Sequence, residues 1–172
     1  MVDVEKCKIT YYPAAVLRGA AKPVTQIDDS IRRLVAKMTD IMIEHRGVGL
    51  AAPQVGLPLR LFIVSLDTSR ENVRAYINPT VTPSGELEEM EEGCLSVPGV
   101  WTKVRRYTHA TVTATDLDGH QFTDDAEGIY ARCLQHEYDH IEGMTIVNRM
   151  GQTARIANRR QLKKLAEEQK GK

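Results

Sequence analysis

The stretch His136-Glu-Tyr-Asp-His140 matches the pattern His-Glu-x-x-His and places a helix at the centre of the expected fold. Residues four positions apart lie on the same face of a helix, so both imidazoles can reach one metal ion. The glutamate between them is then placed to take a proton from a water molecule at that ion. Asp124 and Asp125 are the caps that we expect at the start of this helix, and Ile129 and Cys133 extend its apolar stripe. The sequence therefore predicts a metal site carried by one helix.

The segments that precede this helix are typical of β-strands. Residues 59–66 form an apolar run, and residues 75–78 form a second, shorter candidate. Residues 101–115 alternate in polarity and are rich in Val and Thr. Asp118-Gly119 predicts a turn, after which residues 121–123 complete a hairpin.

Another helix is predicted over residues 27–42, where apolar side chains recur every three or four positions. Asp28 or one of the next two residues can cap its start, and Gly47 stands where a left-handed residue is favoured after its end. Strands that come as a group and are flanked by helices indicate an α+β fold, with antiparallel or mixed sheets around the central helix. We expect one domain over residues 1–172, in which residues 153–172 form a basic C-terminal helix.

The composition excludes several classes of protein. The chain has 172 residues, with 23 Lys or Arg and 23 Asp or Glu, so its formal net charge is zero. This balance argues against a strongly basic nucleic-acid binder, and we expect no DNA partner. No apolar run approaches the roughly 20 residues of a membrane span, and the first residues lack the apolar core of a signal peptide. Three widely spaced cysteines suit a reducing compartment such as the cytoplasm. An organellar protein without its transit segment would look the same.

A catalytic site of this kind needs a third protein ligand. Ile146 occupies the position at which one class of zinc peptidases carries a third histidine, and it cannot bind metal. Glu167 and Glu168 would suit another class of peptidase, but they lie in a basic tail. Cys94 lies next to glycine on irregular backbone, where a cysteine that only fills the core is unusual. Cys133 is the rival, although its simpler interpretation is a small buried residue beside the site.

Three segments give the chain a resemblance to the peptide deformylases. They are Gly47-Val-Gly-Leu-Ala-Ala-Pro-Gln54, Glu92-Gly-Cys-Leu-Ser96 and Gln135-His-Glu-Tyr-Asp-His140, in the order of that family's motifs. The opening Tyr12-Pro-Ala-Ala-Val-Leu-Arg18 is also similar to the start of that family. The resemblance implies a single-domain metallohydrolase that removes the formyl group from the N-terminal formyl-methionine of nascent polypeptides and releases formate.

The resemblance also implies a role for each residue of the site. The implied ligands of one divalent ion, Fe²⁺ with Zn²⁺, Ni²⁺ or Co²⁺ as substitutes, are Cys94, His136 and His140. Glu137 acts as general base on the attacking water and then as general acid toward the leaving amine. The Gln54 amide and the Leu95 backbone N–H stabilise the oxyanion. These roles agree with what formamide hydrolysis requires, namely an activated water, a Lewis acid and an oxyanion hole.

A pocket for the methionine of the substrate is implied as well. The substrate-binding positions carried over are Val48, Gly49, Glu92, Gly93, Ile129 and Cys133. Most of them are apolar or lack a side chain, which suits a thioether, although Ile129 and Cys133 could equally be core residues. The chain departs from the family at Trp101, where many members carry an arginine that meets the substrate backbone. This departure bears on peptide affinity and not on the chemistry.

The C-terminal segment is basic. From Arg149 to Lys172 there are eight Lys or Arg against two Glu. A helix is expected from about residue 153 to 169, with Ile156, Leu162 and Leu165 on one side. Its charged face is either simply solvated or a contact for ribosomal RNA phosphates through Arg155, Arg159, Arg160, Lys163 and Lys164.

Two other functions remain open from the sequence. The first is a zinc peptidase, against which the residue at Ile146 counts. The second is a non-catalytic protein that keeps the site but only binds a peptide or the ribosome, a reading that Trp101 alone favours.

Overall fold

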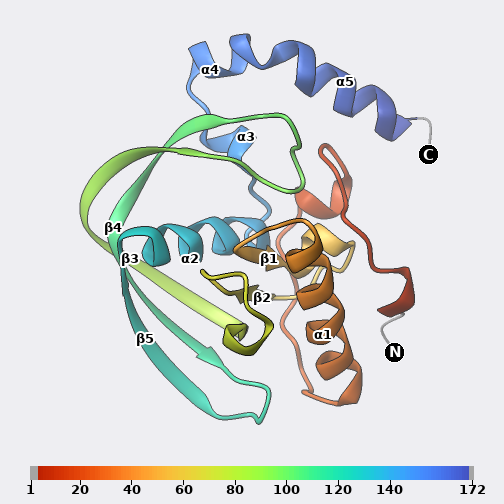
Figure 1. The fold of residues 1–172 in the computed structure, drawn as a ribbon, viewed down its shortest axis with the longest axis vertical. Helices are drawn as coiled ribbons and strands as arrows, with labels where there is room; N and C mark the ends of the chain where they lie inside the picture. Colours follow the sequence, from red (N-terminus) through yellow and green to blue (C-terminus); the bar gives the residue numbers. More distant parts are fainter. Residues whose placement is uncertain (1–3, 171–172) are drawn as a thin grey trace.

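A five-stranded antiparallel sheet curves around one central helix in the computed structural model, which describes residues 4–170 (Figure 1). The strands neighbour one another in chain order: β1 (Gly49–Ala51), β2 (Leu61–Val64), β3 (Arg74–Glu92), β4 (Thr102–Thr115) and β5 (Gln121–Glu127). Each pairs antiparallel with the next. The predicted α+β class and antiparallel sheet are therefore confirmed. Residues 1–3 and 171–172, the two ends of the predicted domain, lie outside the described residues, and with them Lys172 of the basic tail.

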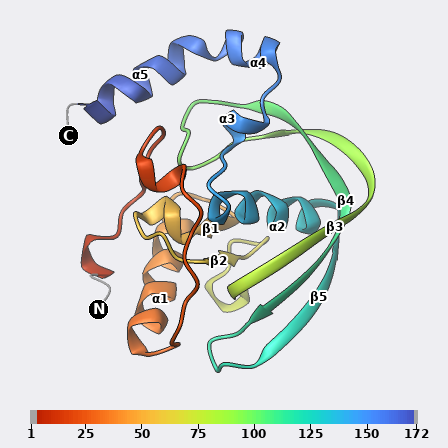
Figure 2. The same cartoon turned by 180° about the vertical axis from the view of Figure 1, so that it is seen from behind.

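The helices lie on several sides of this sheet. The α-helices are α1 (Asp29–Glu44), α2 (Gly128–Ile141), α3 (Ile146–Arg149), α4 (Gln152–Ala157) and α5 (Arg159–Lys170). Short 3₁₀ helices are η1 (Val4–Lys6), η2 (Ala15–Leu17), η3 (Ala52–Val55) and η4 (Arg70–Asn72). The long hairpin of β3 and β4 sweeps around α2, α1 lies beside β1 and β2, and α4 and α5 cross the top of both views (Figures 1 and 2). Within residues 4–170, no helix has the length and apolar character that crossing a membrane requires.

The central helix α2 is buried because it contacts all five strands. Leu134 on this helix is fully buried, in the same apolar cluster as Phe62 of β2 and Tyr76 of β3, whose rings stack with centroids 4.9 Å apart. Gln135 ties the helix to β4. Its amide oxygen accepts a hydrogen bond from the N–H of Tyr107 (3.1 Å), and its amide nitrogen donates one to the carbonyl of the same residue (2.8 Å). Such pairing is what a polar side chain on a buried helix requires.

The start of α1 agrees with the prediction, but its end does not. Asp28 is the N-cap, and its carboxylate accepts hydrogen bonds from the backbone N–H groups of Ser30 and Ile31. At the other end Arg46, and not the predicted Gly47, adopts the left-handed conformation, with φ of 55°. The N–H groups of Arg46 and Gly47 both donate to carbonyls of the last turn of the helix. Glycine adopts this conformation at the least cost, so the residue types alone favour Gly47.

The central helix begins later than the sequence predicts. Asp124 and Asp125 are not its caps but lie in β5, where Asp124 pairs with Arg74 (2.7 Å) and Asp125 accepts a hydrogen bond from a β4 threonine (2.7 Å). The helix starts at Gly128, with φ of 56°, and its N-cap residue Glu127 makes no side-chain capping bond. Residues on neighbouring strands therefore bind the two aspartates that the local sequence assigns to the helix as caps.

Strand β3 is much longer than the predicted segment 75–78. It continues to Glu92 because β4 pairs with it along most of that length. The pairing register shifts around Pro79 and around Gly85, which lets the strand continue past residues that normally interrupt one. A pairing between distant segments thus overrides the local signals for a strand end.

The helix predicted over residues 153–169 is in fact two helices. They are separated at Asn158, whose side-chain amide donates a hydrogen bond to the carbonyl of Ala154 (3.0 Å). Leu165 of α5 is buried in a small apolar cluster. Ile156 is exposed on α4, so the prediction that it shares one side of a helix with Leu165 is wrong. The break turns the two helices so that they no longer share one apolar stripe.

Replacing Leu134 by alanine should destabilise the fold by about 2–5 kcal/mol, because it leaves a cavity in the centre of the molecule. The Ile129→Ala substitution removes a side chain of the same helix that is 54% exposed. Its effect on the free energy of unfolding should stay below about 1 kcal/mol. Urea-induced unfolding of both variants and the parent measures the difference. Equal losses would contradict the burial of α2 described above.

Candidate metal centre

Three side chains that can bind a metal ion meet at one point. His136 and His140 lie one turn apart on α2, with ring centroids 5.1 Å apart, and Cys94 comes from the loop between β3 and β4. The sulfur of Cys94 and one ring nitrogen of each histidine all lie within 4.8 Å of one another. A thiolate with two imidazoles is a donor set that suits Fe²⁺ or Zn²⁺. The residues present therefore fit one bound ion of this kind.

The other candidate ligands lie elsewhere. Cys133 is not in this group, and its sulfur lies 3.8 Å from a backbone carbonyl oxygen. Burial raises the pKa of the Cys133 thiol well above its ordinary value, which disfavours a thiolate. Ile146 is buried in the apolar cluster beneath α5. Glu167 and Glu168 are exposed on α5, where each pairs with a lysine of the same helix. Among residues 4–170, Cys94 is thus the residue that completes the group.

The carboxylate of Glu92 holds His136 in one orientation. Its Oε2 lies 3.0 Å from Nδ1 of His136. Because a carboxylate only accepts, Nδ1 carries the proton and Nε2 keeps its lone pair for a metal ion. Arg106 donates two hydrogen bonds to Glu92 (2.7 and 3.0 Å), and Arg132 donates a third (2.8 Å). Burial opposes the charge of Glu92, but the hydrogen bonds from His136 and Arg106 outweigh it, so the pKa of Glu92 lies well below its ordinary value.

A second carboxylate joins this buried network. Asp139 on α2 accepts a hydrogen bond from Arg106 (2.9 Å) and two from Arg149 (3.0 and 2.5 Å). Arg106 is itself buried on β4 and so connects Glu92 at the end of β3 with Asp139 on the helix. The charged groups beneath the metal site therefore link the sheet to α2.

Glu137 faces the same site from α2. It is buried, and its Oε2 has no hydrogen-bond partner among the described residues. A Cβ atom on Gly49 would lie 2.5 Å from the Glu137 Oε1, so only a glycine leaves room for this carboxylate. Burial raises the pKa of Glu137 to about 7, against the opposing positive charges of His136 and Arg106. A carboxyl group with this pKa can both accept and donate a proton near neutral pH.

Gln54 presents its amide to the site from η3. Its Oε1 accepts a hydrogen bond from the backbone N–H of Ala51 (2.8 Å). This contact turns the amide nitrogen toward Cys94, whose sulfur lies 3.5 Å away. Leu95, the residue after Cys94, lines the same pocket. A side-chain N–H donor and a backbone segment therefore border the metal-binding group.

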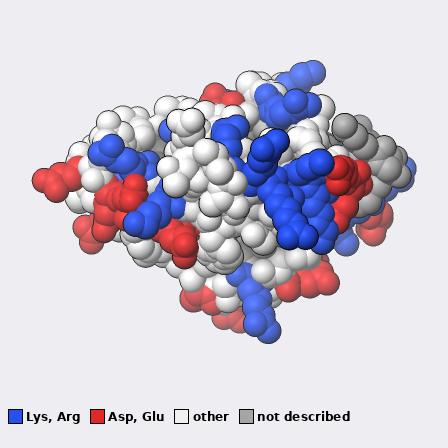
Figure 3. Space-filling model, turned by 90° about the horizontal axis from the view of Figure 1, so that it is seen from above, with Lys and Arg blue, Asp and Glu red and all other residues white. Residues whose placement is uncertain are grey.

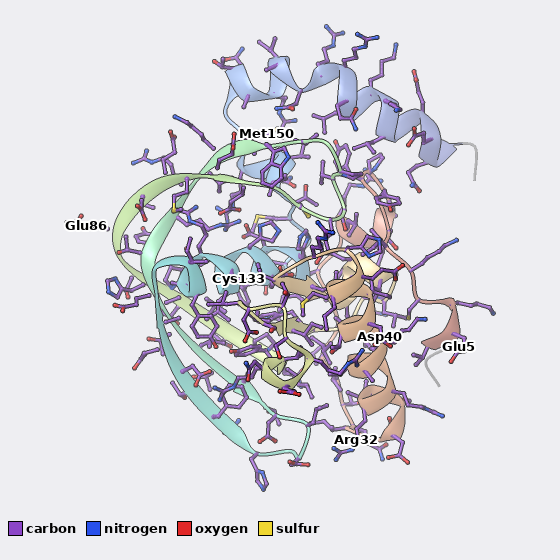
Figure 4. All side chains as sticks on the ribbon, in the orientation of Figure 1. Glu5, Arg32, Asp40, Glu86, Cys133 and Met150 are labelled. Carbon is purple, nitrogen blue, oxygen red and sulfur yellow. The ribbon has the colours of Figure 1, made fainter. Side chains whose placement is uncertain are left out.

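A pocket of about 540 Å³ opens beside these residues. All six predicted substrate-binding positions line it: Val48, Gly49, Glu92, Gly93, Ile129 and Cys133. Cys133 lies in the middle of the molecule, on the central helix (Figure 4). Trp101 also lines the pocket, is 64% exposed, and sets its ring against Gly93. The carboxylate of Glu92 is already engaged by two arginines and His136, so it is not free to bind a ligand.

Three basic residues of the pocket have no counterpart among the predicted site residues. Arg132 follows Ile129 by three positions on α2, and this helical spacing is the signal that could have found it. His45 and Arg46 lie just after α1, and their only signal is that they directly precede the glycine-rich segment starting at Gly47.

Comparison with known proteins assigns this arrangement to a family. The family model described as polypeptide deformylase matches residues 6–155. A peptide deformylase of Neisseria gonorrhoeae is 42% identical over 156 residues, which cover 91% of this chain and 93% of that protein. The chain belongs to the peptide deformylase family. The solved peptide deformylase of Legionella pneumophila is similar with a TM-score of 0.88 at 42% identity, over 96% of this chain and 98% of that one. A Plasmodium falciparum peptide deformylase structure gives 0.92 at 36% identity, over 95% and 98%.

Membership of the peptide deformylase family confirms the resemblance drawn from three sequence motifs. In the fold these motifs become β1 with η3, the loop after β3, and α2. They are distant in sequence, but residues of all three border one pocket. The motifs that carry the family resemblance therefore form one site in the fold.

Substituting Arg106 by methionine should destabilise the fold by about 3–5 kcal/mol, because Glu92 and Asp139 would each stay buried with one cationic partner fewer. Arg149 is a matched control, since it binds Asp139 too but has a side chain that is 41% exposed. Arg149→Met should lower the free energy of unfolding by about 1 kcal/mol or less. Chemical denaturation measures both values, and a larger loss for Arg149 than for Arg106 would contradict the role of Arg106.

Proposed function

We propose that this chain is an active peptide deformylase, which hydrolyses the formyl group of an N-terminal formyl-methionine on a nascent polypeptide and releases formate. The observation that carries the proposal is that three metal-binding side chains meet at one point, beside a pocket that a buried carboxylate and an amide also line. Hydrolysis of a formamide requires an activated water, a Lewis acid and donors for the oxyanion, and this set can supply each of them. The relative from Neisseria gonorrhoeae, which carries the name peptide deformylase, supports the same activity.

Cys94, His136 and His140 would hold one divalent ion. We expect Fe²⁺, with Zn²⁺, Ni²⁺ or Co²⁺ able to replace it, since a thiolate and two imidazoles suit all four ions. When bound, the ion supplies a Lewis acid that polarises the formyl carbonyl and makes a water molecule more acidic. Glu92 keeps the Nε2 lone pair of His136 available through its hydrogen bond to Nδ1 (3.0 Å).

Glu137 would move the proton of the reaction. Its Oε2 lacks a partner among the described residues, and its pKa of about 7 leaves much of it ionised at neutral pH. We assign to Oε2 the proton of the attacking water and then its delivery to the amine nitrogen that leaves. Gly49 supports this role, because the absent side chain leaves the space in which the carboxylate lies.

Gln54 and Leu95 would stabilise the negative charge that develops on the formyl oxygen. The Gln54 amide nitrogen is fixed toward the site by the bond between its Oε1 and the Ala51 N–H. The backbone N–H of Leu95 is a second donor in our assignment. Donors that are oriented before the reaction stabilise an oxyanion without reorganisation.

The methionine side chain of the substrate would lie against the apolar wall formed by Val48, Ile129 and Cys133. The exposed ring of Trp101 would cover the residues that follow the methionine in the substrate. It stands where we expect a charged residue from the family resemblance. An unbranched thioether adapts to an apolar wall of this kind, which supports the choice of methionine.

We also propose that α5 contacts the ribosome. Lys and Arg side chains gather on the face seen from above, where α4 and α5 lie (Figure 3). The exposed basic residues of this segment are Arg155, Arg159, Arg160, Lys163 and Lys164. RNA phosphates are the acceptors that such a surface would meet. We include residues 153–172 in the same domain, since Leu165 is buried and Gln161 donates a hydrogen bond to the carbonyl of Pro98 (2.8 Å). A bacterial cytoplasmic location, still a prediction, suits this substrate.

The activity is tested by formate release from formyl-Met-Ala-Ser, with the full chain loaded anaerobically with Fe²⁺ or Ni²⁺. The parent should release formate, and Glu137→Ala should keep its metal but lose turnover by on the order of 10²–10⁴-fold, because it removes the proton carrier. Glu167→Ala, on exposed α5, is the matched control and should behave as the parent. A near-parental rate in Glu137→Ala would refute the mechanism. Peptide-bond cleavage without formate release would point to a peptidase.

The metal site is tested by two serine variants. Cys94→Ser should weaken metal affinity by more than the roughly 10–100-fold that is typical when a ligand loses its hydrogen-bond partner. Cys133→Ser, a change of the same size on the pocket wall, should leave metal content at the parental level. Elemental analysis after dialysis against a chelator gives both values, and the opposite ranking would exchange the roles of the two cysteines.

A further inference from the structure

Within residues 4–170, the part of the pocket wall that is exposed to solvent carries basic side chains but no acidic ones. Glu92, Arg132 and Glu137 belong to the wall, but all three are buried. The exposed basic side chains that line it are His45 and Arg46, which directly follow α1. Among the described residues that line the pocket, no acidic side chain is exposed. A peptide that enters the pocket therefore meets a basic rim.

Arg46 has an uncommitted guanidinium at this rim. Across residues 4–170 Arg46 forms no ion pair, as is also true of several other arginines such as Arg33, but among these unpaired arginines it is Arg46 that lines the pocket. His45 differs, since its Nδ1 donates a hydrogen bond to the carbonyl of Ile41 (2.9 Å). A guanidinium is a cation whose planar donors match the geometry of a carboxylate. Its charge is thus available to a carboxylate of a bound molecule.

The backbone at position 46 favours a different residue. Its φ of 55° is in the left-handed region, which glycine adopts readily and arginine does not. Helices commonly end with a glycine at this position, and here Gly47 stands one place too late to serve. A strained residue beside a binding pocket is a reason to look for a function of its side chain. The pocket rim gives that function, because the side chain adds positive charge there.

The place of Arg46 along the chain matches the place of the first residues after the methionine. Gly49 faces the carboxylate of Glu137, since its Cβ position lies 2.5 Å from Oε1. Arg46 precedes Gly49 by three residues, at most roughly 11 Å of extended backbone. In an extended formyl-peptide, the second and third Cα atoms lie roughly 6–10 Å from the formyl carbon. In the described sheet β1 pairs only with β2, so an extended peptide can run along its other side.

We propose that Arg46 is a specificity residue, whose guanidinium pairs with an acidic side chain at the second or third position of the formyl-peptide and disfavours a basic one there. The proposal rests on the deformylase function proposed above, and it names the class of substrate that the pocket prefers. An exposed ion pair is modest, so we expect a preference of about fivefold in kcat/KM for glutamate over lysine at low ionic strength. Added salt should reduce this preference, because the pair is open to solvent.

The test compares formyl-Met-Glu-Ser, formyl-Met-Gln-Ser and formyl-Met-Lys-Ser, together with the three peptides that carry the same residues at position three. The metal-loaded full chain is assayed for formate release, and kcat/KM is measured for each peptide. The parent should favour glutamate over lysine by about fivefold in one of the two series. Arg46→Gly should bring this ratio close to one, and Arg46→Glu should invert it. A ratio between peptides on one enzyme cancels any general loss of activity.

Arg33→Gln is the matched control. Arg33 is exposed on α1, next to Arg32, which Figure 4 labels at the end of α1 that lies away from Cys133. The variant removes one positive charge but should keep the parental ratio. Arg46→Gly should also raise the melting temperature or leave it unchanged, because glycine relieves the left-handed backbone. If Arg46 only supported the fold, Arg46→Gly would not abolish the preference for glutamate over lysine while also making the fold more stable.

Three results would overturn the proposal: a parental ratio near one in both series, a ratio that survives Arg46→Gly, or an equal loss in Arg33→Gln. Failure of the parent to release formate even from formyl-Met-Gln-Ser is a different result, which would contradict the deformylase function itself. The neutral peptide therefore separates the two failures.

Discussion

Buried charge needs a partner, and the centre of this molecule depends on how Arg106 provides one. Its guanidinium binds Glu92 at the end of β3 and Asp139 on α2, so one side chain holds the strand end against the helix. The same carboxylate of Glu92 orients His136. Cys94 follows Glu92 by two residues, so the position of the sulfur depends on the same pairing. The sheet, the helix and the metal-binding group are thereby fixed relative to one another by one cation.

The residues of the metal site could be predicted from the sequence because each belongs to a short local pattern. His136 and His140 need only the helical repeat, and the cysteine motif and the glycine-rich motif point to Cys94 and Gln54 through the family resemblance. The structure places Gln54, Cys94 and His136 on one pocket, and His140 joins Cys94 and His136 in the metal-binding group. Arg132 could not be predicted as a site residue, because a charged residue on a helix with exposed faces normally points to solvent. Only the tertiary fold shows that the Arg132 guanidinium donates a hydrogen bond to Glu92.

Two errors in the predicted elements, at the start of α2 and at the end of β3, have one physical cause, which is that pairing between distant segments overrides local signals. Asp124 has the chemistry of a helix cap, but Arg74 from another strand binds it instead. The long partner strand β4 carries β3 past Pro79, where sequence alone predicts an end. Arg46 adopts the left-handed conformation that Gly47 would adopt at less cost, and residue propensities do not predict this. Local chemistry thus predicts which element forms, and long-range contacts decide where it ends.

The narrow space at Gly49 has a consequence for how this enzyme can change over generations. The carboxylate of Glu137 occupies the volume that any side chain at position 49 would need. A mutant that acquired even a methyl group there would push the carboxylate out of place. A ligand that gains its affinity by resting on this bare backbone would therefore be hard to escape by mutation, since the obvious substitution would disable the enzyme along with the binding site. The rim of the pocket, built from exposed side chains such as Trp101, has no such restriction and is free to vary.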